Sequence, residues 1–234
     1  MTVISERERE YEEFLYCITH DLKSFSRAMR VIPDWIAEDL TAAKIALPDG
    51  VGEHMDMLKS YAGGMDRMLE SLTTLSRVGR LADPCADHAL NDLLDAAWAS
   101  LTPGSARLSV PQHAFRVHGP KNDLSRLFAA LLSNGVDHNS DPSPDIGVTA
   151  VRDGERVQIR VADNGPGIEA QYRQKVFEPL HTLRPKDETG HAGMGLAIAR
   201  KVVKSLGGEI HIEEPSAGHG CRVVFDLPGA KTAA

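Results

Sequence analysis

Near its start, the chain carries apolar residues in alternating steps of three and four. This heptad spacing puts an apolar seam along one face of a long helix, and such a seam is buried against another helix rather than a sheet. We therefore expect a long N-terminal helix that needs a helical partner, with a kink where Pro33 removes a backbone hydrogen bond. The seam residues are Leu15, Ile18, Leu22, Phe25, Met29, Ile32 and Ile36.

The chain encodes that partner a short distance further on. Residues 48–50, Pro-Asp-Gly, end the first helix with turn chemistry. Two antiparallel helices have too little core to be stable alone, so a second copy of the chain is expected to bury both seams in a four-helix bundle. The sequence thus predicts a homodimer. The seam of the second helix consists of Leu58, Tyr61, Met65, Met68, Leu72 and Leu75.

After about residue 82 the heptad stops, and short strands alternate with helices. We place a domain boundary near Asp83, with an antiparallel helical hairpin over 1–82 and an α/β sandwich over 83–234. The elements expected in the sandwich are a helix capped by Asp123, a β-hairpin turning at Asp153-Gly154, a helix over 195–206 ended by Gly207, and a strand pair at 208–213 and 221–227.

Composition excludes several classes of protein. A formal net charge of −7 without a basic stripe argues against a nucleic-acid binder, whose phosphate contacts need clustered Lys and Arg. Cys17, Cys85 and Cys221 are far apart and show no Cys-x-x-Cys spacing, so neither a disulfide framework nor a zinc site is expected. No stretch approaches the roughly 18 apolar residues of a membrane span. The expected compartment is therefore a reducing cytoplasm.

The first residue of chemical interest is Asn134. Its spacing from Leu124, Leu127 and Leu131 puts it on the apolar stripe of its helix. A buried Asn satisfied by backbone groups is one interpretation. The other is a carbonyl oxygen offered to Mg²⁺, which takes few protein ligands and completes its shell with water and phosphates.

A second motif, Asp163-Asn-Gly-Pro-Gly-Ile168, directly follows an expected strand. Asn-Gly and Pro-Gly are common turn dipeptides, so a plain turn is one interpretation. The alternative is an adenine pocket. There the carboxylate of Asp163 accepts a hydrogen bond from the exocyclic amine, while Gly165 and Gly167 let the backbone approach the base.

A third motif opens the helix expected over 195–206. Gly190, Gly193 and Gly195 lie where backbone amides and the helix dipole attract anions, although a flexible glycine-rich loop is the simpler interpretation. The polar stretch 181–191, between the second and third motifs, is long enough to form a lid over a ligand.

The order of these motifs is more specific than any one of them. Together with Phe-x-Pro at 177–179, they resemble, over about residues 122–228, the ATP-binding domain shared by histidine kinases, Hsp90, MutL and DNA gyrase. The resemblance implies that Asn134 coordinates Mg²⁺, Asp163 recognises adenine, and Gly193 and Gly195 contact phosphates. The ATP-binding set that it implies is Asn134, His138, Asp163, Gly165, Gly167, Ile168, Gly193, Gly195 and Leu196, with Arg184 and Lys186 as candidates for a phosphate clamp.

Within that superfamily, the N-terminal half of the chain indicates which kind of protein the chain resembles. Residues 14–24 look like the phosphoacceptor segment of sensor histidine kinases, of the His-Asp-Leu-Lys type found in phytochrome-like kinases. The heptad turns His20 to the outer face, and Asp21 lies beside it as a general base. The resemblance implies ATP-dependent autophosphorylation of His20, transfer to an aspartate of a response-regulator receiver domain, and an upstream sensor domain or protein.

Several positions depart from the family's pattern. Ser24 stands where Thr or Asn is associated with phosphatase activity and partner contact, and Asp137 stands where a phosphate-binding Lys often lies. Two other functions therefore stay open: a histidine phosphotransfer protein or pseudokinase scaffold, and a superfamily ATPase that uses ATP as a conformational clamp. The remaining departures are Phe25, Ala130, His191 and Cys221.

Overall fold

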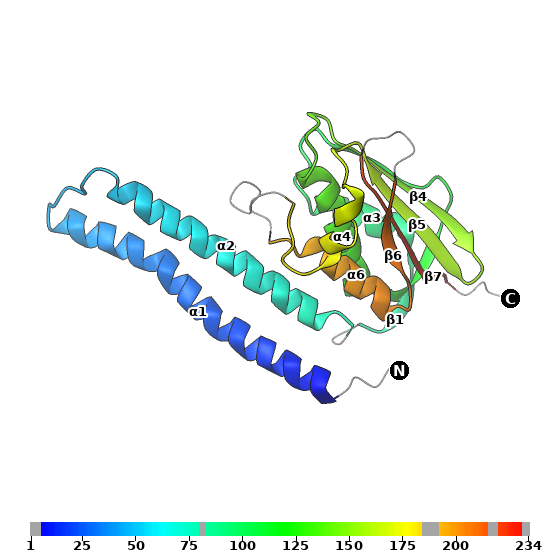
Figure 1. The fold of residues 1–234 in the computed structure, drawn as a ribbon, viewed down its shortest axis with the longest axis horizontal. Helices are drawn as coiled ribbons and strands as arrows, with labels where there is room; N and C mark the ends of the chain where they lie inside the picture. The colour runs from blue at the N-terminus through cyan, green and yellow to red at the C-terminus, as the bar shows by residue number, and fades with distance from the viewer. Residues whose placement is uncertain (1–5, 80–82, 184–191, 215–219, 231–234) are drawn as a thin grey trace. The chain divides into compact units, whose positions relative to one another are not determined.

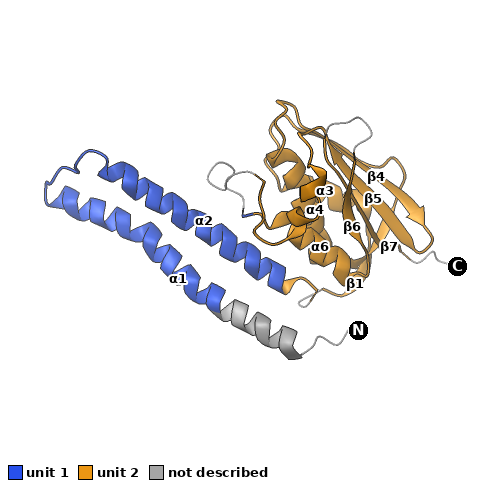
Figure 2. Cartoon of the chain, viewed as in Figure 1, with its two compact units in different colours: residues 1–76, 186–192 blue, residues 77–185, 193–234 orange. Residues whose placement is uncertain are grey.

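The structure is a computed structural model that describes residues 6–79, 83–183, 192–214 and 220–230, with side chains from residue 18 onward. The chain divides into two compact units (Figure 2), and the division in the sequence falls between Ser76 and Arg77. The first unit is helical, and the second combines helices with strands.

Two long helices form the first unit. α1 spans Glu6–Ala42 and α2 spans Val51–Arg77, and the chain reverses direction between them with a positive φ of 84° at Gly50. The helices are antiparallel (Figure 1), which confirms the predicted helical hairpin. α1 continues through Pro33, as expected for a proline inside the helix, and bends along its length.

Polar contacts join α1 to α2. Ser26 is fully buried, and its hydroxyl donates a hydrogen bond of 2.8 Å to the backbone oxygen of Ala62. Lys59 on α2 forms an ion pair of 3.0 Å with Asp34 on α1. Because each contact joins one specific position on each helix, together they fix the register of the hairpin.

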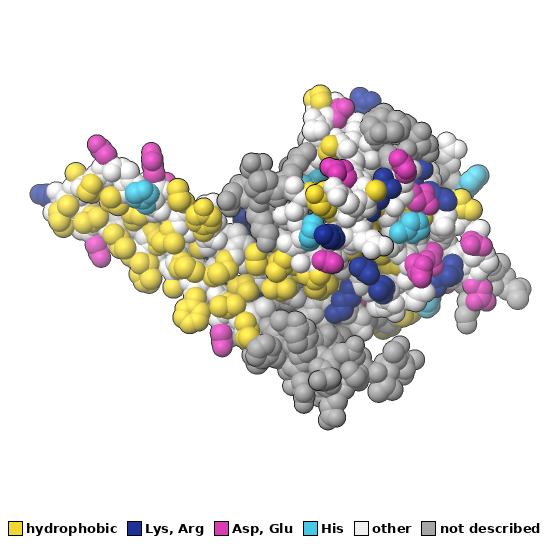
Figure 3. All heavy atoms as spheres, in the orientation of Figure 1, with side chains coloured by type: hydrophobic (Ala, Val, Ile, Leu, Met, Phe, Trp, Pro, Cys, Tyr) yellow, Lys and Arg dark blue, Asp and Glu magenta, His cyan; other side chains and the backbone are white. Residues whose placement is uncertain are grey.

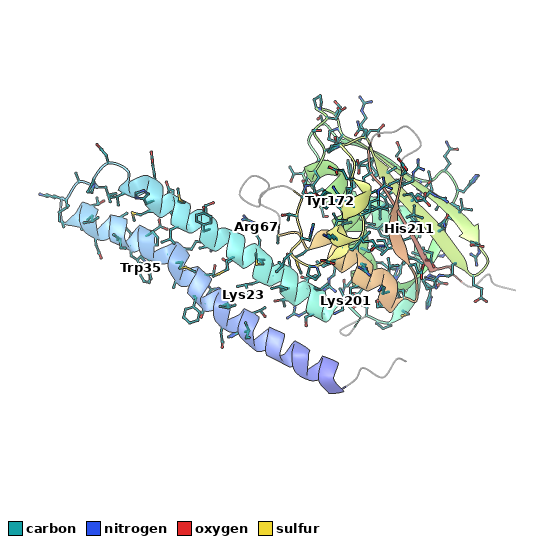
Figure 4. All side chains as sticks on the ribbon, viewed as in Figure 1. Lys23, Trp35, Arg67, Tyr172, Lys201 and His211 are labelled. Carbon is teal, nitrogen blue, oxygen red and sulfur yellow. The ribbon has the colours of Figure 1, made fainter. Side chains whose placement is uncertain are left out.

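The apolar seam of the hairpin remains largely exposed in the single chain. Phe25 is 63% exposed and Tyr61 is 59% exposed. Trp35, which lies beside the seam residue Ile36, is 60% exposed and points away from α2 (Figure 4). Figure 3 shows apolar side chains along the length of the hairpin. The hairpin therefore presents an apolar surface well beyond the isolated exposed residues of an ordinary monomer.

In the second unit, helices α3, α4 and α6 cover one face of a five-stranded sheet (Figure 1). The strand order is β2-β4-β5-β7-β6, with β2 and β4 parallel and the other neighbours antiparallel, while β1 and β3 form a separate pair. This confirms the predicted α/β sandwich. The elements are β1 (Cys85–Ala89), α3 (Leu90–Ala99), β2 (Arg107–Ser109), β3 (Arg116–Pro120), α4 (Lys121–Asp137), β4 (Asp145–Asp153), β5 (Arg156–Asp163), the 3₁₀ turns η1 (Ala170–Tyr172) and η2 (Lys175–Phe177), α6 (Gly195–Ser205), β6 (Ile210–Glu213) and β7 (Arg222–Pro228).

Alternating residues of the central strands supply the core of the sandwich. In β5, Val157, Ile159 and Val161 are buried while their neighbours are half-exposed. The ring of Phe128 in α4 lies 6.2 Å from that of Phe225 in β7, tilted by 54°. Each such buried side chain contributes about 1.5–3 kcal/mol. The packed sheet and α4 therefore give the loops at their ends a rigid support.

The end of α6 confirms the predicted glycine stop. Gly207 has a φ of 70°, its N–H donates to the oxygen of Lys204 at 3.0 Å, and the N–H of Gly208 donates to the oxygen of Val203 at 2.9 Å. These two bonds form a Schellman motif, which favours a residue without Cβ at position 207.

The prediction that Asp123 caps α4 is wrong. The helix begins at Lys121 directly after an extended Pro120, so Asp123 lies inside its first turn. β3 runs straight into α4 and leaves no loop in which a side chain could act as the cap. Asp123 is instead buried, and it accepts a hydrogen bond of 3.0 Å from the backbone of Gly79.

The division between the units differs from the expected boundary near Asp83. Val78 is 2% exposed, and a Cβ on Gly79 would lie 3.3 Å from the Cβ of Ser205 in α6. The two residues that follow α2 therefore pack into the second unit, which moves the division back to Ser76–Arg77.

Candidate nucleotide site and phosphoacceptor

Asp163 ends β5 with its two carboxylate oxygens in different roles. Oδ1 accepts the backbone N–H groups of Gly165 at 2.9 Å and Cys221 at 3.1 Å. The Asp163 N–H donates in turn to the Cys221 oxygen at 2.9 Å. Among the described residues nothing donates to Oδ2. One oxygen is thus held by the protein, and the other is free to accept from a ligand amine.

Burial shifts the pKa values of two side chains here, Asp163 and Cys221. It raises the pKa of Asp163, although the N–H groups of Gly165 and Cys221 pull that pKa in the opposite direction. Burial, together with the nearby Asp163 carboxylate, raises the pKa of the Cys221 thiol to about 12, partly offset by Arg173. The thiol therefore stays protonated at neutral pH.

Two glycines bring the Asp163 loop close to the start of β7. Gly167 has a φ of 78°, and a Cβ there would lie 2.7 Å from the oxygen of Gly220. Gly220 has a φ of 88°, and a Cβ there would lie 2.0 Å from the oxygen of Asp163. No side chain fits at either position, so the backbone itself forms this wall.

Asn164 joins the Asp163 loop to the loop that follows α4. Its Oδ1 accepts from Nδ2 of Asn139 at 2.7 Å and from the N–H of Asp145 at 2.8 Å. Its Nδ2 donates to the oxygen of Ser143 at 3.4 Å. These tertiary contacts position Asp163 relative to α4. The sequence had suggested only turn chemistry for the Asn-Gly dipeptide.

α4 places Asn134 between the other two motifs. At Gly135, the next residue, a Cβ would lie 3.7 Å from the Cβ of Asp163, and a Cβ on Gly195 would lie 3.7 Å from the oxygen of Ala130. Asn134 itself is half-buried, and among the described residues its carboxamide makes no hydrogen bond. Its oxygen is therefore available as a single ligand for a hard cation such as Mg²⁺.

The N-terminus of α6 forms the other side of the site. Gly193 has a φ of 66°, and a Cβ there would lie 2.7 Å from the oxygen of His181. The N–H of Ile198 bonds to Met194, so the amides of the first turn, beginning at Gly195, have no helical partner. Those amides and the helix dipole can bind an anion.

The remaining predicted nucleotide residues lie around these groups. His138 is half-buried at the end of α4, Ile168 is half-buried after the glycine loop, and Leu196 is buried in α6. Asp137, which the sequence placed at a phosphate-binding position, is exposed and accepts the hydroxyl of Ser133. Residues 184–191 of the expected lid, which include Arg184, Lys186 and His191, lie outside the described residues.

His20 lies on the surface of α1, on the outer face that the heptad predicts. Its side chain and that of Asp21 are each 76% exposed, and Nδ1 of His20 lies 3.2 Å from Oδ1 of Asp21. The hydroxyl of Ser24 donates to the backbone oxygen of Asp21 at 2.6 Å, while Thr19 is buried. The imidazole is thus accessible from solvent and oriented by a neighbouring carboxylate.

The sheet, its helical layer and the site at the end of α4 define an ATP-binding domain. Residues 119–231 match the family described as histidine kinase-, DNA gyrase B- and HSP90-like ATPase. Similarity to sensor kinases extends over the whole chain. The methanogenesis regulatory histidine kinase FilI of Methanothrix harundinacea (strain 6Ac) is 29% identical over 230 residues, which cover 96% of this chain and 25% of FilI. The ATPase domain over residues 119–231 and this similarity along the rest of the chain support a two-component sensor histidine kinase catalytic core, as its motifs predicted.

Solved structures share this fold. The chain is similar to full-length ShkA, crystallised with AMPPNP, with a TM-score of 0.67 and 20% identity over 95% of this chain and 47% of that one. It is also similar to histidine kinase ThkA in complex with the response regulator protein TrrA, with a TM-score of 0.63 and 17% identity over 94% of this chain and 64% of that one. Of the helices that the structure describes, none has the length and apolar character of a membrane span.

Proposed function

We propose that this chain is an ATP-dependent protein histidine kinase, which phosphorylates His20 and passes the phosphoryl group to an aspartate of a response regulator. The observation that carries the proposal is the exposed His20–Asp21 pair, in a chain whose second unit is an ATP-binding domain. A phosphoacceptor must be reached from outside, and a general base must lie within hydrogen-bond reach of its proton. The pair meets both requirements.

The geometry of the pair suggests the role of each ring nitrogen. In the tautomer with its proton on Nδ1, His20 donates that proton to Asp21, and Nε2 keeps a lone pair for in-line attack on the γ-phosphorus. As the N–P bond forms, the bond between the γ-phosphorus and the leaving ADP oxygen breaks, and Asp21 takes up the Nδ1 proton.

The second unit would position the phosphoryl donor. Oδ2 of Asp163 would accept the adenine amine, while Gly193 and the first turn of α6 would hold the phosphates. Asn134 would hold Mg²⁺ through its carboxamide oxygen, and the bound ion would offset phosphate charge. The described residues contain no cluster of three His, Cys, Asp or Glu side chains suited to a metal ion. That fits an ion held mostly by water and phosphate.

The exposed seam of the hairpin supports the homodimer as part of this proposal. Phe25 and Ile32 on α1 and Tyr61 on α2 are between 44% and 63% exposed in a single chain. A second hairpin would cover these side chains and complete a four-helix bundle. Burying apolar area stabilises such a pair by about 25 cal/mol per Å².

The comparisons support the proposed partners. ThkA has been solved with a response regulator and ShkA with AMPPNP, so we extend both kinds of binding to this chain. An upstream sensor is proposed because the chain spans only 25% of the length of FilI. A reducing cytoplasm fits the free thiols of Cys85 and Cys221. Ser24, whose exposed hydroxyl donates to the backbone oxygen of Asp21, is proposed as the phosphatase or partner contact beside His20.

Incubation of the chain with γ-labelled ATP and Mg²⁺ tests this function. We expect an acid-labile, alkali-stable label that phosphosite mapping assigns to His20, and no label in His20→Gln. His54→Gln, at an exposed position on α2, is the matched control and should label normally. A folded chain without label would favour the phosphotransfer or scaffold alternative. Unchanged labelling and nucleotide turnover in His20→Gln would favour the ATP-clamp alternative.

A further inference from the structure

Asp123 is the one acidic side chain that is buried in the described parts of the chain, at 2% exposure. Its Oδ1 accepts a hydrogen bond of 2.9 Å from Nη1 of Arg126, and its Oδ2 accepts the backbone N–H of Gly79 at 3.0 Å. Burial of a carboxylate is unfavourable unless the group is paired and hydrogen-bonded. Both contacts therefore help to keep Asp123 where it is.

The Gly79 contact fixes the start of the connection between α2 and β1. α2 ends at Arg77 and β1 begins at Cys85, so residues 78–84 join the two elements. Val78 is 2% exposed, and Gly79 has a φ of 80° that favours glycine. The first two residues of the connection thus form part of the second unit.

The contact between Asp123 and Gly79 involves α4 and α6, the two helices that carry the phosphate side of the site. It lies at the ends of these helices that are far from the site. Asp123 lies in the first turn of α4, whereas Asn134 lies in its last turn. Ser205, which a Cβ on Gly79 would meet at 3.3 Å, ends α6, whereas Gly195 begins it. Loss of the anchor should therefore leave the nucleotide site itself intact.

The helix dipole does not explain this arrangement. An acid in the first turn of a helix is favourable wherever it points, and Asp92 occupies the equivalent position in α3 while remaining exposed. The dipole accounts for an acid at position 123. It accounts neither for its burial nor for its bond to Gly79.

We propose that Asp123 is a positioning residue for the phosphorylation of His20. Its carboxylate clamps the Gly79 amide and so sets the point at which the chain from α2 is attached to the ATP-binding unit. Without the clamp, residues 78–84 would become a free tether with a reach of roughly 20–25 Å. The γ-phosphate would then meet His20 at a lower effective concentration and in fewer productive orientations. The inference rests on the kinase function proposed above.

The clamp should affect phosphoryl transfer rather than ATP binding. In Asp123→Ala we expect the rate of His20 phosphorylation at saturating ATP to fall about three- to tenfold, with an unchanged KM for ATP. Asp123→Asn keeps an oxygen for the Gly79 amide and should restore most of the rate. Gly79→Ala breaks the same anchor from the other side, because a Cβ at a φ of 80° would crowd Ser205. It should reproduce the loss without any change in α4.

The experiment compares these variants in the full chain, with Asp92→Ala as the matched control. Asp92→Ala removes an acid from the same helical position but from no clamp, so it should phosphorylate His20 at the wild-type rate. Hydrogen exchange of the Gly79 amide gives a second measurement that is independent of activity. The amide should be protected in the wild type and in Asp123→Asn, and should lose protection in Asp123→Ala.

Three results would overturn the proposal. The first is an unchanged rate in Asp123→Ala after the Gly79 amide has lost its protection. The second is a rise in the KM for ATP that accounts for the whole loss, since Asp123 would then support the nucleotide site. The third is a faster rate, which would make the contact inhibitory. A wild-type chain that never labels His20 overturns the kinase function instead, while Gly79 protection still reports whether the clamp exists.

Discussion

Replacement of Asp163 by Asn turns one carboxylate oxygen into an amide nitrogen and preserves the shape of the side chain. The N–H groups of Gly165 and Cys221 approach Oδ1 at 2.9 and 3.1 Å, so the carboxamide must keep its oxygen there and direct its NH₂ into the pocket. The adenine amine then meets a donor instead of an acceptor. Loss of one hydrogen bond to a charged group costs about 1.5–3 kcal/mol. ATP binding should therefore weaken about 10- to 150-fold.

The stability of the fold should not fall with ATP affinity. Because burial raises the pKa of Asp163, the folded state favours the protonated carboxyl. Its stabilising contribution is present below the unfolded pKa and is lost as the pH rises through the folded pKa. At neutral pH the uncharged Asn avoids this loss, so the Tm of Asp163→Asn should equal or exceed that of the wild type.

Equilibrium dialysis with labelled ATP and Mg²⁺, together with thermal unfolding, measures both effects. Asp153→Asn is the matched control, because Asp153 is exposed at the end of β4 and its replacement removes the same charge. The control should bind ATP like the wild type. A folded Asp163→Asn that binds ATP within about threefold of the wild type would refute the assignment of the adenine contact.

Four further outcomes are expected. Acidification should weaken ATP binding with a midpoint above the ordinary Asp pKa of 3.8, because Asp163 is protonated earlier than usual; an affinity titration that shows a midpoint at or below 3.8 would contradict this. Gly193→Ala would place a Cβ 2.7 Å from the oxygen of His181 at a φ of 66°. The Tm and the rate of His20 labelling should therefore both fall, with a loss of about 1–3 kcal/mol in the free energy of unfolding. A variant with the Tm and the labelling rate of the wild type would show that position 193 does not need glycine. EDTA should abolish labelling of His20, and added Mg²⁺ should restore it at a higher concentration for Asn134→Ala than for the wild type; an equal requirement would exclude Asn134 as the ligand. Phe25→Ser combined with Tyr61→Ser should shift sedimentation from dimer to monomer, whereas Val151→Ser, at a 53% exposed position in the second unit, should not; a dimer that persists would place the interface elsewhere.

Elements with one clear period were predictable from the sequence. The heptads gave the two hairpin helices, and Asp153-Gly154 gave the β4–β5 hairpin. The segment 85–120 had no such signal. β1 is mostly exposed and lacks alternation, and its partner β3 lies a whole helix further along the chain. Such pairing depends on tertiary contacts that no local window of sequence contains.

Part of the candidate site could likewise be predicted from the sequence, and part of it could not. The order of the motifs was enough to suggest Asp163 and its glycines, because backbone approach and a carboxylate have strong sequence signatures. The bonds from Asn164 to Asn139 could not be predicted, since they join two loops that only the folded sheet brings together. The sequence predicted Asp123 as a helix cap because Asp often has that role at the start of a helix. Its burial inside the first turn depends on the hydrogen bond from Gly79, which lies 44 residues earlier in the chain.

The buried thiol beside the pocket bears on how this protein would respond to oxidants. Peroxides and electrophiles attack the thiolate form of cysteine, and a pKa of about 12 leaves Cys221 almost entirely in the unreactive form at neutral pH. Cys85 is exposed and so meets such reagents first. Nucleotide binding should therefore persist under oxidative stress that has already modified the surface of the same domain.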